Sequence, residues 1–380
     1  MKILFIEPCY IGFGGYFRAL NICKGLARNK ITTDLLVTNN KKFCLKIEKE
    51  KIEKNLTLYK LPRIYINFYI NGRILRGLIA TFFGLSKKYD IIHAAMPTQF
   101  ESNIPAVILK IFRKKVVMDW DEIFEDTFHV NFLIDYYIHF CEHSLVKYFK
   151  NYCVTSDALV KLLKQRGAKK IVKVINGTDF SEFNPQNKLQ YRQKLNLDPK
   201  AKYLFAYGNT FGANRPFKFF KTFEYIVKLD PTIKLLCNFN PQDIYQRDHL
   251  EGKIDPNIFS NIINLGYISN KEYLYTADAA LFLSGDGLCE QANYPIRIGS
   301  YIGSNLIIAI NDGQSEASNS LKKENCAITS KNLKTLAQKT VEFLNNPIIQ
   351  QKYHQRLEKA KNHFSIEYLT LDLIKFYKKI

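Results

Sequence analysis

Short apolar runs alternate with stretches of helical length along almost the whole chain. In the first half the runs are KILFI, TDLLV, DIIHAA, KKVVMDW and NYCVT. Each run is long enough for one buried strand, and each intervening stretch is long enough for a helix. This alternation predicts a parallel sheet with helices on both faces.

A second series of the same kind follows, with KYLFAYG, IKLLCNF, NIINLG, DAALFLS, NLIIAI and NCAIT. Between the two series lies INGTDFSEFNPQNKLQYRQKL, where Asn, Gly, Asp, Ser and Pro interrupt the apolar periodicity. We therefore expect an α/β fold with two Rossmann-like doubly wound domains, 1–188 and 189–364, that face a cleft. Residues 365–380 have apolar residues at helical spacing and are too few for a domain, so they are expected to pack on one of the two.

Composition narrows the choice of partner. The 55 Lys and Arg residues against 35 Asp and Glu give a formal charge of +20. This balance favours an anionic partner such as a nucleotide, an acidic lipid surface or nucleic acid.

The eight cysteines form no C-x-x-C pair and several lie in or beside apolar runs, as reduced core cysteines of a cytosolic protein do. The first apolar run is too short for a signal peptide, so the chain is expected to start in the cytoplasm.

Residues 61–90 interleave Arg63, Arg73 and Arg76 with aromatic and aliphatic side chains and end near a Lys pair. A helix that lies on a membrane surface has this composition. A core helix whose arginines extend to water has it too, and the two interpretations carry equal weight. No apolar run reaches the roughly 18 to 20 residues that a membrane span requires.

In an open parallel sheet, ligands bind beyond the carboxyl ends of the strands. Gly12, Gly14 and Gly15 follow the first strand and precede a helix, where unshielded backbone N–H groups can approach an anion. Their spacing matches neither G-x-G-x-x-G nor a P-loop, and a tight turn would also need glycine. His93 lies at the end of the run YDIIHAAM and is expected to face the cleft, where it would bind a sugar or transfer a proton. A hydrogen-bonded core histidine is the alternative.

Acidic and histidine-rich stretches in the first half suggest metal sites only weakly. Asp119 and Asp121 form a D-x-D pair that could bind a hard cation. A metal-dependent enzyme with one nucleotide-binding domain would leave the second strand series without a purpose, so we favour acceptor binding or helix capping and expect no metal. His139 and His143 share a helical face, but no third ligand can be named, and a coincidence of helical spacing is favoured.

The second half contains two candidate anion sites. A strand and a Gly-Asn turn at Asn209 precede Arg215 and Lys218. Cations at the start of a helix oppose its dipole, which suggests an anion between them, although a solvated basic face is the alternative. In GLCEQANYPIRIGSYIGSN, proline suits a first helical turn, the amides around Asn293 point outward, and Arg297 can bind a phosphate in bidentate fashion. Together these groups would hold a diphosphate.

The order of these motifs resembles the retaining, two-domain glycosyltransferases of family 4, which have the GT-B architecture. The resemblance is strongest in VTSDALVKLLKQRGAKKIVKVINGTDFSEFNP and in IINLGYISNKEYLYTADAALFLS, includes the Gly14–Gly15 pair, and covers nearly the whole chain. It implies that the C-terminal domain holds a nucleotide-diphosphate sugar, that the N-terminal domain holds the acceptor, and that no cofactor or metal is obligatory. It also implies that residues 365–380 pack back on the N-terminal domain.

The sequence departs from the family pattern at the donor site. The second glutamate of the Glu-x7-Glu pair, which bonds the donor ribose, falls on Ser300, and the first falls on Ala292, with Glu290 two residues earlier. The Gly-Arg and Lys that hold the diphosphate fall on Gly208–Asn209 and Asn214.

The sequence therefore predicts a cytoplasmic glycosyltransferase on the inner face of a membrane, with a glycan or lipid-linked glycan acceptor and an anionic membrane surface as partner. Arg297, Arg215 and Lys218 would stabilise the leaving diphosphate, and His93 and Glu290 would position the reacting sugar. One alternative is a catalytically inactive glycosyltransferase-like subunit that binds a partner enzyme or lipid. A nucleic-acid-binding protein is suggested by charge alone and lacks a recognition module.

Overall fold

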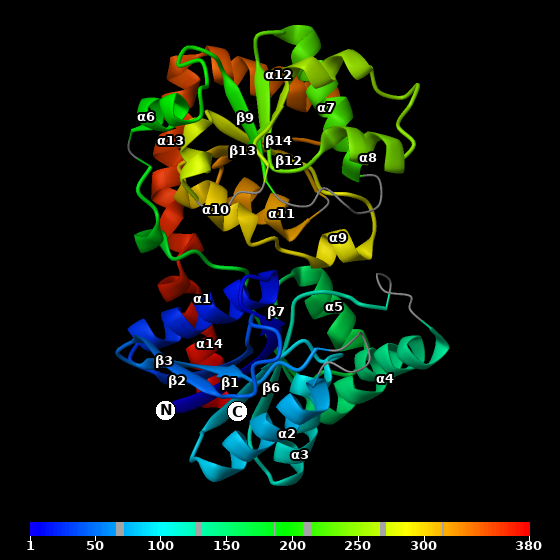
Figure 1. The fold of residues 1–380 in the computed structure, drawn as a ribbon, viewed down its shortest axis with the longest axis vertical. Coiled ribbons are helices and arrows are strands. Elements are labelled where there is room, and N and C mark those ends of the chain that lie inside the picture. The colour runs from blue at the N-terminus through cyan, green and yellow to red at the C-terminus, as the bar shows by residue number, and fades with distance from the viewer. Residues whose placement is uncertain (66–71, 126–130, 186, 208–214, 267–270, 314) are drawn as a thin grey trace. The chain divides into compact units, whose positions relative to one another are not determined.

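The computed structural model describes residues 1–65, 72–125, 131–185, 187–207, 215–266, 271–313 and 315–380 (Figure 1). Its contacts divide the chain into two units. The first comprises Met1–Gly177, Ala292–Ile296 and Phe364–Ile380, and the second comprises Thr178–Gln291 and Arg297–His363.

The division falls at Gly177 and not near residue 188, where the sequence analysis placed it. The reason is packing in the segment that follows Gly177. A Cβ atom added at Gly299 would lie 2.0 Å from Oγ1 of Thr178, and one added at Gly303 would lie 2.7 Å from the ring of Phe183. Both glycines belong to the second unit, so the polar segment after Gly177 packs there.

The first unit contains an eight-stranded sheet. Its strands are β1 (Lys2–Tyr10), β2 (Thr32–Thr38), β3 (Glu48–Glu53), β4 (Leu56–Leu61), β5 (Ile91–Ala95), β6 (Val116–Trp120), β7 (Asn151–Val154) and β8 (Lys170–Lys173), in the order β3-β4-β2-β1-β5-β6-β7-β8. All neighbours are parallel except β3 and β4. The strand order reverses at β1, which pairs with β2 on one side and β5 on the other.

Helices cover both faces of this sheet, as its nearly continuous apolar strands require. They are α1 (Gly14–Arg28), α2 (Arg73–Ser86), α3 (Phe100–Ile111), α4 (Phe132–Phe149), α5 (Asp157–Gln165) and α14 (Ile366–Lys379). One core cluster joins α1 and α14 to the strands through residues such as Phe5, Cys23 and Tyr377. Figure 1 shows α2 and α3 side by side, and α3 contacts β1, β5 and β6.

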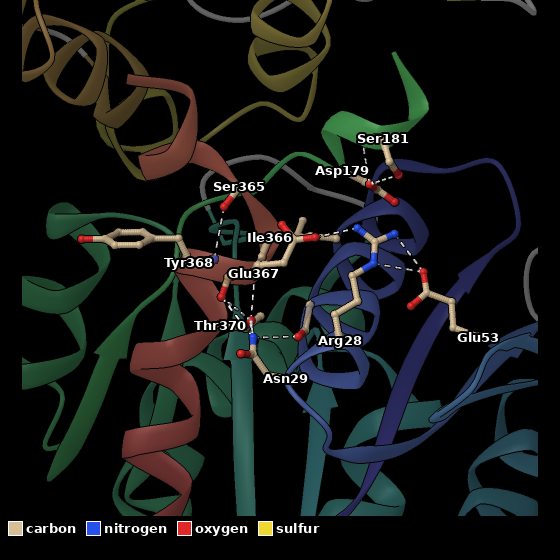
Figure 2. A network of polar contacts seen from close by, with 11 residues as sticks. Arg28, Asn29, Glu53, Asp179, Ser181, Ser365, Ile366, Glu367, Tyr368 and Thr370 are labelled. Atoms are coloured by element: carbon tan, nitrogen blue, oxygen red, sulfur yellow. Dashed lines mark hydrogen bonds and ion pairs between the residues drawn. The ribbon is translucent and has the colours of Figure 1, made fainter. Parts of the chain in front are cut away.

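Residues 365–380 contain the whole of α14, which packs on α1 (Figure 2). A Cβ atom added at Gly25 would lie 2.5 Å from the carbonyl oxygen of Ile366, so only glycine permits this approach. Around this contact, Arg28 donates to carboxylate oxygens of Glu53 at 2.9 Å and Glu367 at 2.6 Å. The C-terminal helix is thus part of the first unit.

The second unit contains a six-stranded, all-parallel sheet. Its strands are β9 (Tyr203–Ala206), β10 (Lys234–Cys237), β11 (Ile262–Asn264), β12 (Ala279–Phe282), β13 (Ile307–Asn311) and β14 (Ala327–Ser330), in the order β11-β10-β9-β12-β13-β14. The order reverses between β9 and β12. The predicted α/β fold with two parallel-sheet domains is therefore confirmed.

The α-helices of the second series are α6 (Lys188–Lys194), α7 (Arg215–Leu229), α8 (Pro241–Arg247), α9 (Leu288–Ala292), α10 (Arg297–Gly303), α11 (Glu316–Lys323), α12 (Leu333–Asn345) and α13 (Pro347–Ala360). Of these, α6 precedes β9, and the others come after it along the chain. Among the described residues, no helix combines the length and the apolar character that a bilayer crossing demands.

Candidate functional site

The carboxyl ends of β9 and β12 form the point of reversal in the second sheet, which is the expected ligand position in an open α/β sheet. A small cavity of about 10 Å³ lies there. It is lined by Ala206, Tyr207, Arg215, Phe219, Leu281, Phe282, Leu283, Arg297 and Tyr301. This volume holds about one water molecule. The cavity is therefore too small to contain a nucleotide and can form only part of a nucleotide site.

Two arginines predicted as phosphate ligands come together at this cavity. The guanidinium carbons of Arg215 and Arg297 lie 6.0 and 5.5 Å from the centroid of the Phe282 ring. Nη1 of Arg297 donates to the carbonyl oxygen of Tyr207 at 2.8 Å. Burial lowers the pKa of Arg297, and the charge of Arg215 lowers it further. A guanidinium stays protonated even so, and guanidinium groups are donors of the kind that can bind phosphate oxygens.

Acidic side chains of the second unit contact the predicted cations. Nη2 of Arg215 donates to Oε2 of Glu290, and the backbone N–H of Gly285 donates to the same oxygen at 3.2 Å. Nζ of Lys218 donates to Oδ1 of Asp286 at 2.5 Å. The sequence analysis expected Glu290 to position the reacting sugar. In the structure, Glu290 instead pairs with Arg215.

Two further residues, Ser300 and Asn209, were predicted to bind the nucleotide-sugar donor, and of these the structure describes Ser300, which is not among the residues that line the cavity. Ser300 is half-buried on α10, close to the buried Tyr301, whose hydroxyl accepts from the backbone N–H of Tyr207 at 2.8 Å. Burial raises the pKa of Tyr301 to about 12. Asn209 lies outside the described residues, as do Gly208 and Asn214.

Asn293 belongs to the first unit, together with the rest of Ala292–Ile296. Its Nδ2 atom donates to Oε1 of Glu122 at 3.3 Å. Next to it, the carbonyl oxygen of Ala292 accepts from the hydroxyl of Thr155 at 3.2 Å. This side-chain hydrogen bond of Asn293 is thus to an acidic residue of the first unit.

His93 does not face an opening. Its side chain is fully buried, and its ring stacks on Phe5 with centroids 4.3 Å apart. Nδ1 lies 2.5 Å from the hydroxyl of Tyr377, and Nε2 lies 3.7 Å from a carboxylate oxygen of Asp119. Burial lowers the pKa of His93. Because His93 is the middle residue of β5 and both faces of that strand are covered, it has the position of a core histidine, and we assign it no contact with substrate.

Asp119 is also buried and does not reach an acceptor. Its two carboxylate oxygens accept from Nη2 and Nε of Arg18 at 2.6 and 2.8 Å. Although burial alone would raise it, this pairing holds the pKa of Asp119 well below its usual range. Arg18 also donates to Oδ1 of Asn176 at 2.8 Å. The expected acceptor role of Asp119 is therefore replaced by a buried ion pair that joins β6 to α1.

Asp121 keeps a half-buried position just beyond the carboxyl end of β6. Burial raises its pKa well above the usual value, and the neighbouring Glu122 carboxylate raises it further. Of the two predicted acceptor residues, Asp121 is the one that is only partly buried.

Glu7 is a titratable residue that the sequence analysis did not single out. Its side chain is 3% exposed, and burial raises its pKa to about 7. Oε1 accepts from the backbone N–H of Cys9 at 2.9 Å. A Cβ atom added at Gly15 would lie 2.8 Å from the same oxygen, whereas one at Gly14 would meet nothing within 4 Å. Close contact with Glu7 therefore requires glycine at position 15. The sequence feature that could have identified Glu7 is an acidic residue within the first, mostly apolar strand.

His139 and His143 have an acidic partner that sequence spacing did not identify. Nδ1 of His139 and Nε2 of His143 lie 2.5 and 2.8 Å from the carboxylate oxygens of Glu125. Two histidines and a carboxylate can bind zinc. Nη2 of Arg166, however, donates to Oε2 of Glu125 at 3.2 Å and competes with any cation. The contacts in this structure are those of an ion-pair cluster.

A second group of possible metal ligands combines His93, Asp119 and Cys153, all of them buried. The guanidinium of Arg18 is bonded to Asp119 and lies 3.7 Å from the sulfur of Cys153. This positive charge opposes a cation at the same place. Within the part of the chain that the structure describes, these two groups are the candidates for a metal site.

No family model matches the sequence. No curated protein matches it either. Solved structures do match over the whole length. Sucrose-phosphate synthase from Thermosynechococcus elongatus is 14% identical, with a TM-score of 0.70 over 100% of this chain and 98% of that one. Anabaena HepE, solved in complex with UDP-glucose, is 12% identical, with a TM-score of 0.70 over 100% of both chains.

WaaG, a glycosyltransferase involved in lipopolysaccharide biosynthesis, is 12% identical, with a TM-score of 0.65 over 99% of this chain and 98% of that one. At these identities the likeness concerns the fold. The GT-B architecture predicted from the sequence is confirmed, while membership of family 4 and retention of configuration stay predictions. The chain has the two-domain α/β fold of the GT-B glycosyltransferases.

Proposed function

We propose that this protein is a glycosyltransferase that moves a sugar from a nucleotide-diphosphate donor to a glycan or lipid-linked glycan, with retention and without an obligatory metal. The observation that carries the proposal is the pair of Arg215 and Arg297 at the point of reversal of the second sheet. Ligands of open α/β sheets bind at such points, and HepE, which has the same fold, was solved with UDP-glucose.

In the proposed mechanism, the arginines stabilise the charge that develops on the leaving diphosphate. Such fixed donors act more strongly in a water-poor site than in bulk water. Glu290 now neutralises Arg215, so donor binding exchanges this carboxylate for phosphate oxygens. The released Glu290 then accepts a hydrogen bond from a donor hydroxyl, which is the role that the altered Glu-x7-Glu pattern leaves open. Lys218 adds positive charge from the next turn of α7.

The acceptor would bind to the first unit, with Asp121 as a hydrogen-bonding group. A membrane-linked acceptor is supported by exposed apolar side chains on α2, which are Ile74, Leu75, Leu78, Phe82 and Leu85. Lys87 and Lys88 follow this helix. An apolar stripe with adjacent lysines suits the surface of an anionic bilayer, and we propose that the protein docks there from the cytoplasmic side.

An inactive subunit is the second candidate. It is favoured by the same pair of Arg215 and Glu290, because a permanent internal carboxylate would occupy the place of a phosphate. An inactive subunit would bind no nucleotide, whereas the enzyme exchanges Glu290 for one.

Calorimetric titration with UDP, GDP, dTDP and UDP-glucose tests the proposal. We expect one nucleotide to bind and Arg297→Ala to weaken it about 10- to 100-fold, since a hydrogen bond to a charged group contributes roughly 1.5 to 3 kcal/mol. Arg247→Ala, which removes an exposed cation on α8, is the matched control and should bind like the wild type. Absence of binding by all four ligands to the folded protein would instead support the inactive subunit.

A further inference from the structure

The first unit has a large pocket at its own point of strand reversal. The pocket has a volume of about 470 Å³. Its lining residues are Pro8, Cys9, Tyr10, Thr38, Lys42, Arg63, Tyr65, Arg73, Arg76, Met96, Gln99 and Glu101. Several of these lie at or just beyond the carboxyl ends of β1, β2 and β5. Position and volume are those of a site for a small-molecule ligand.

The lining carries a strong excess of positive charge. Four basic side chains and one acidic side chain contribute to it, for a net formal charge of +3. Nη2 of Arg76 donates to Oε1 of Glu101 at 2.7 Å, and both side chains are 5% exposed. Nε of Arg73 lies 3.9 Å from the same oxygen. Glu101 thus lies close to two of the arginines, and the lining as a whole keeps a net formal charge of +3.

Two tyrosine rings pack against the guanidinium of Arg63 at one wall of the pocket. The guanidinium carbon of Arg63 lies 4.4 Å from the centroid of the Tyr10 ring and 5.7 Å from that of Tyr65. Nη1 of Arg63 donates to the carbonyl oxygen of Asn40 at 2.9 Å. Nζ of Lys42 lies 5.8 Å from the Tyr65 centroid. Because Arg63 is ordered before a ligand arrives, binding costs less side-chain entropy.

We propose that this pocket binds a phosphate group carried by the acceptor, next to the sugar that receives the transferred residue. A lining with a net formal charge of +3 matches a phosphate better than an uncharged glycan, and arginine donors suit phosphate oxygens. The tyrosine rings offer apolar faces to the sugar. The inference rests on the proposed function, because it describes the acceptor of that reaction. The phosphate has two possible sources, a phosphorylated sugar or the diphosphate of a lipid carrier.

Binding experiments separate these sources. The full-length protein is titrated with glucose 6-phosphate, with geranyl diphosphate, with glucuronate and with glucose. We expect one of the two phosphate compounds to bind at least about tenfold more tightly than glucose, consistent with charged hydrogen bonds. Tighter glucose 6-phosphate binding identifies a phosphorylated sugar, and tighter geranyl diphosphate binding identifies a lipid diphosphate. Equal binding of glucose and the phosphates, or preference for glucuronate, overturns the inference.

Substitutions of residues that line the pocket test whether the phosphate compound binds there. Arg63→Ala and Lys42→Ala should each weaken phosphate binding about tenfold, as loss of one charged contact does. Lys42 is exposed, so its replacement tests the pocket even if Arg63→Ala reduces folding. Lys51→Ala removes an exposed cation on β3 outside the pocket and should bind like the wild type. Unchanged binding by Lys42→Ala and Arg63→Ala, with folding verified by circular dichroism, overturns the assignment.

The same titrations on Arg297→Ala separate this inference from the proposed function. Phosphate binding should persist there while nucleotide binding weakens. If UDP or another nucleotide binds to the wild type but neither phosphate compound does, the pocket assignment fails and the glycosyltransferase proposal stands. If the phosphate compounds bind and no nucleotide does, the ligand class of the pocket stands and the transfer reaction fails.

Discussion

Arg18 explains why several chemically suggestive residues of the first unit are structural. Its guanidinium binds both oxygens of Asp119, the amide oxygen of Asn176 and the carbonyl oxygen of Val174. Since a buried charge must be paired, this contact set fixes Asp119 in the core. His93 lies against the same carboxylate. No spacing rule in a single sequence indicates that residues 18 and 119 meet, so the sequence analysis treated Asp119 as available for substrate.

The buried Glu7 gives a pH dependence with a definite sign. Its pKa is raised from 4.5 to about 7 by burial, so between these values the folded state binds more protons than the unfolded state. The free energy of unfolding therefore falls as pH rises through this window, by on the order of 3 kcal/mol from this group. Glu7→Gln cannot ionise, and its stability should decline less between pH 4.5 and 8 in urea denaturation. Glu251→Gln, at an exposed position, serves as control. Parallel pH curves for Glu7→Gln and wild type would contradict the assignment.

At the scale of elements, apolar periodicity located β1, β2, β5, β6 and β7 of the first sheet and all six strands of the second, but not β3, β4 or β8. The parallel pairing of the located strands followed from the alternation of strands and helices, whereas β3 and β4, which have no helix between them, pair antiparallel. The position of His93 was misjudged because the strand continues through Ala94 and Ala95, so the histidine is internal to β5. The pocket of the first unit was not predicted. Tyr10, Arg63 and Met96 are far apart in sequence and meet only through the order of β1, β4 and β5, which one sequence does not specify.

The contact between α1 and α14 depends on the absence of a side chain at position 25. Gly25→Ala would place a methyl carbon 2.5 Å from the Ile366 oxygen and 2.8 Å from the Thr370 side chain. Displacement of α14 should lower the free energy of unfolding by about 1 to 3 kcal/mol. Arg28→Ala loses partly exposed ion pairs on the same helix and should cost less than about 1 kcal/mol. Chemical denaturation measures both, and a smaller effect for Gly25→Ala than for Arg28→Ala would exclude close packing at Gly25.

At the scale of the whole molecule, the formal charge of +20 is partly explained by the two sheets. Each unit has basic side chains at the point where its strand order reverses, Arg215 and Arg297 in one and Arg63 and Arg73 in the other. The two anion sites that we propose would suit a reaction in which both substrates bear phosphate. The arginines of residues 61–90 thus line a pocket, while the apolar side chains of α2 are the ones that remain exposed.

If α2 docks on the membrane, replacing one of its exposed apolar residues should weaken binding to lipid vesicles. Phe82 is 69% exposed, and burying such a ring in lipid contributes roughly 1.5 to 3 kcal/mol. Phe82→Asp should lower the partition onto vesicles of phosphatidylglycerol and phosphatidylcholine at least about tenfold in a flotation assay. Leu229→Asp alters an exposed apolar residue of the second unit and should leave partition unchanged. Equal loss in both variants, or none for Phe82→Asp, would rule out α2 as the docking element.

The first unit is assembled from three separate stretches of the chain, with α14 as the last. A fragment that stopped at Gly177 would lack Tyr377, and with it the hydroxyl beside His93 and part of the apolar cover of α1. Ribosomal synthesis completes that layer only after α14 has emerged. Engineers who recombine halves of such proteins should therefore transplant the terminal helix together with the amino-terminal half, since a simple two-piece exchange would pair α1 with a foreign partner.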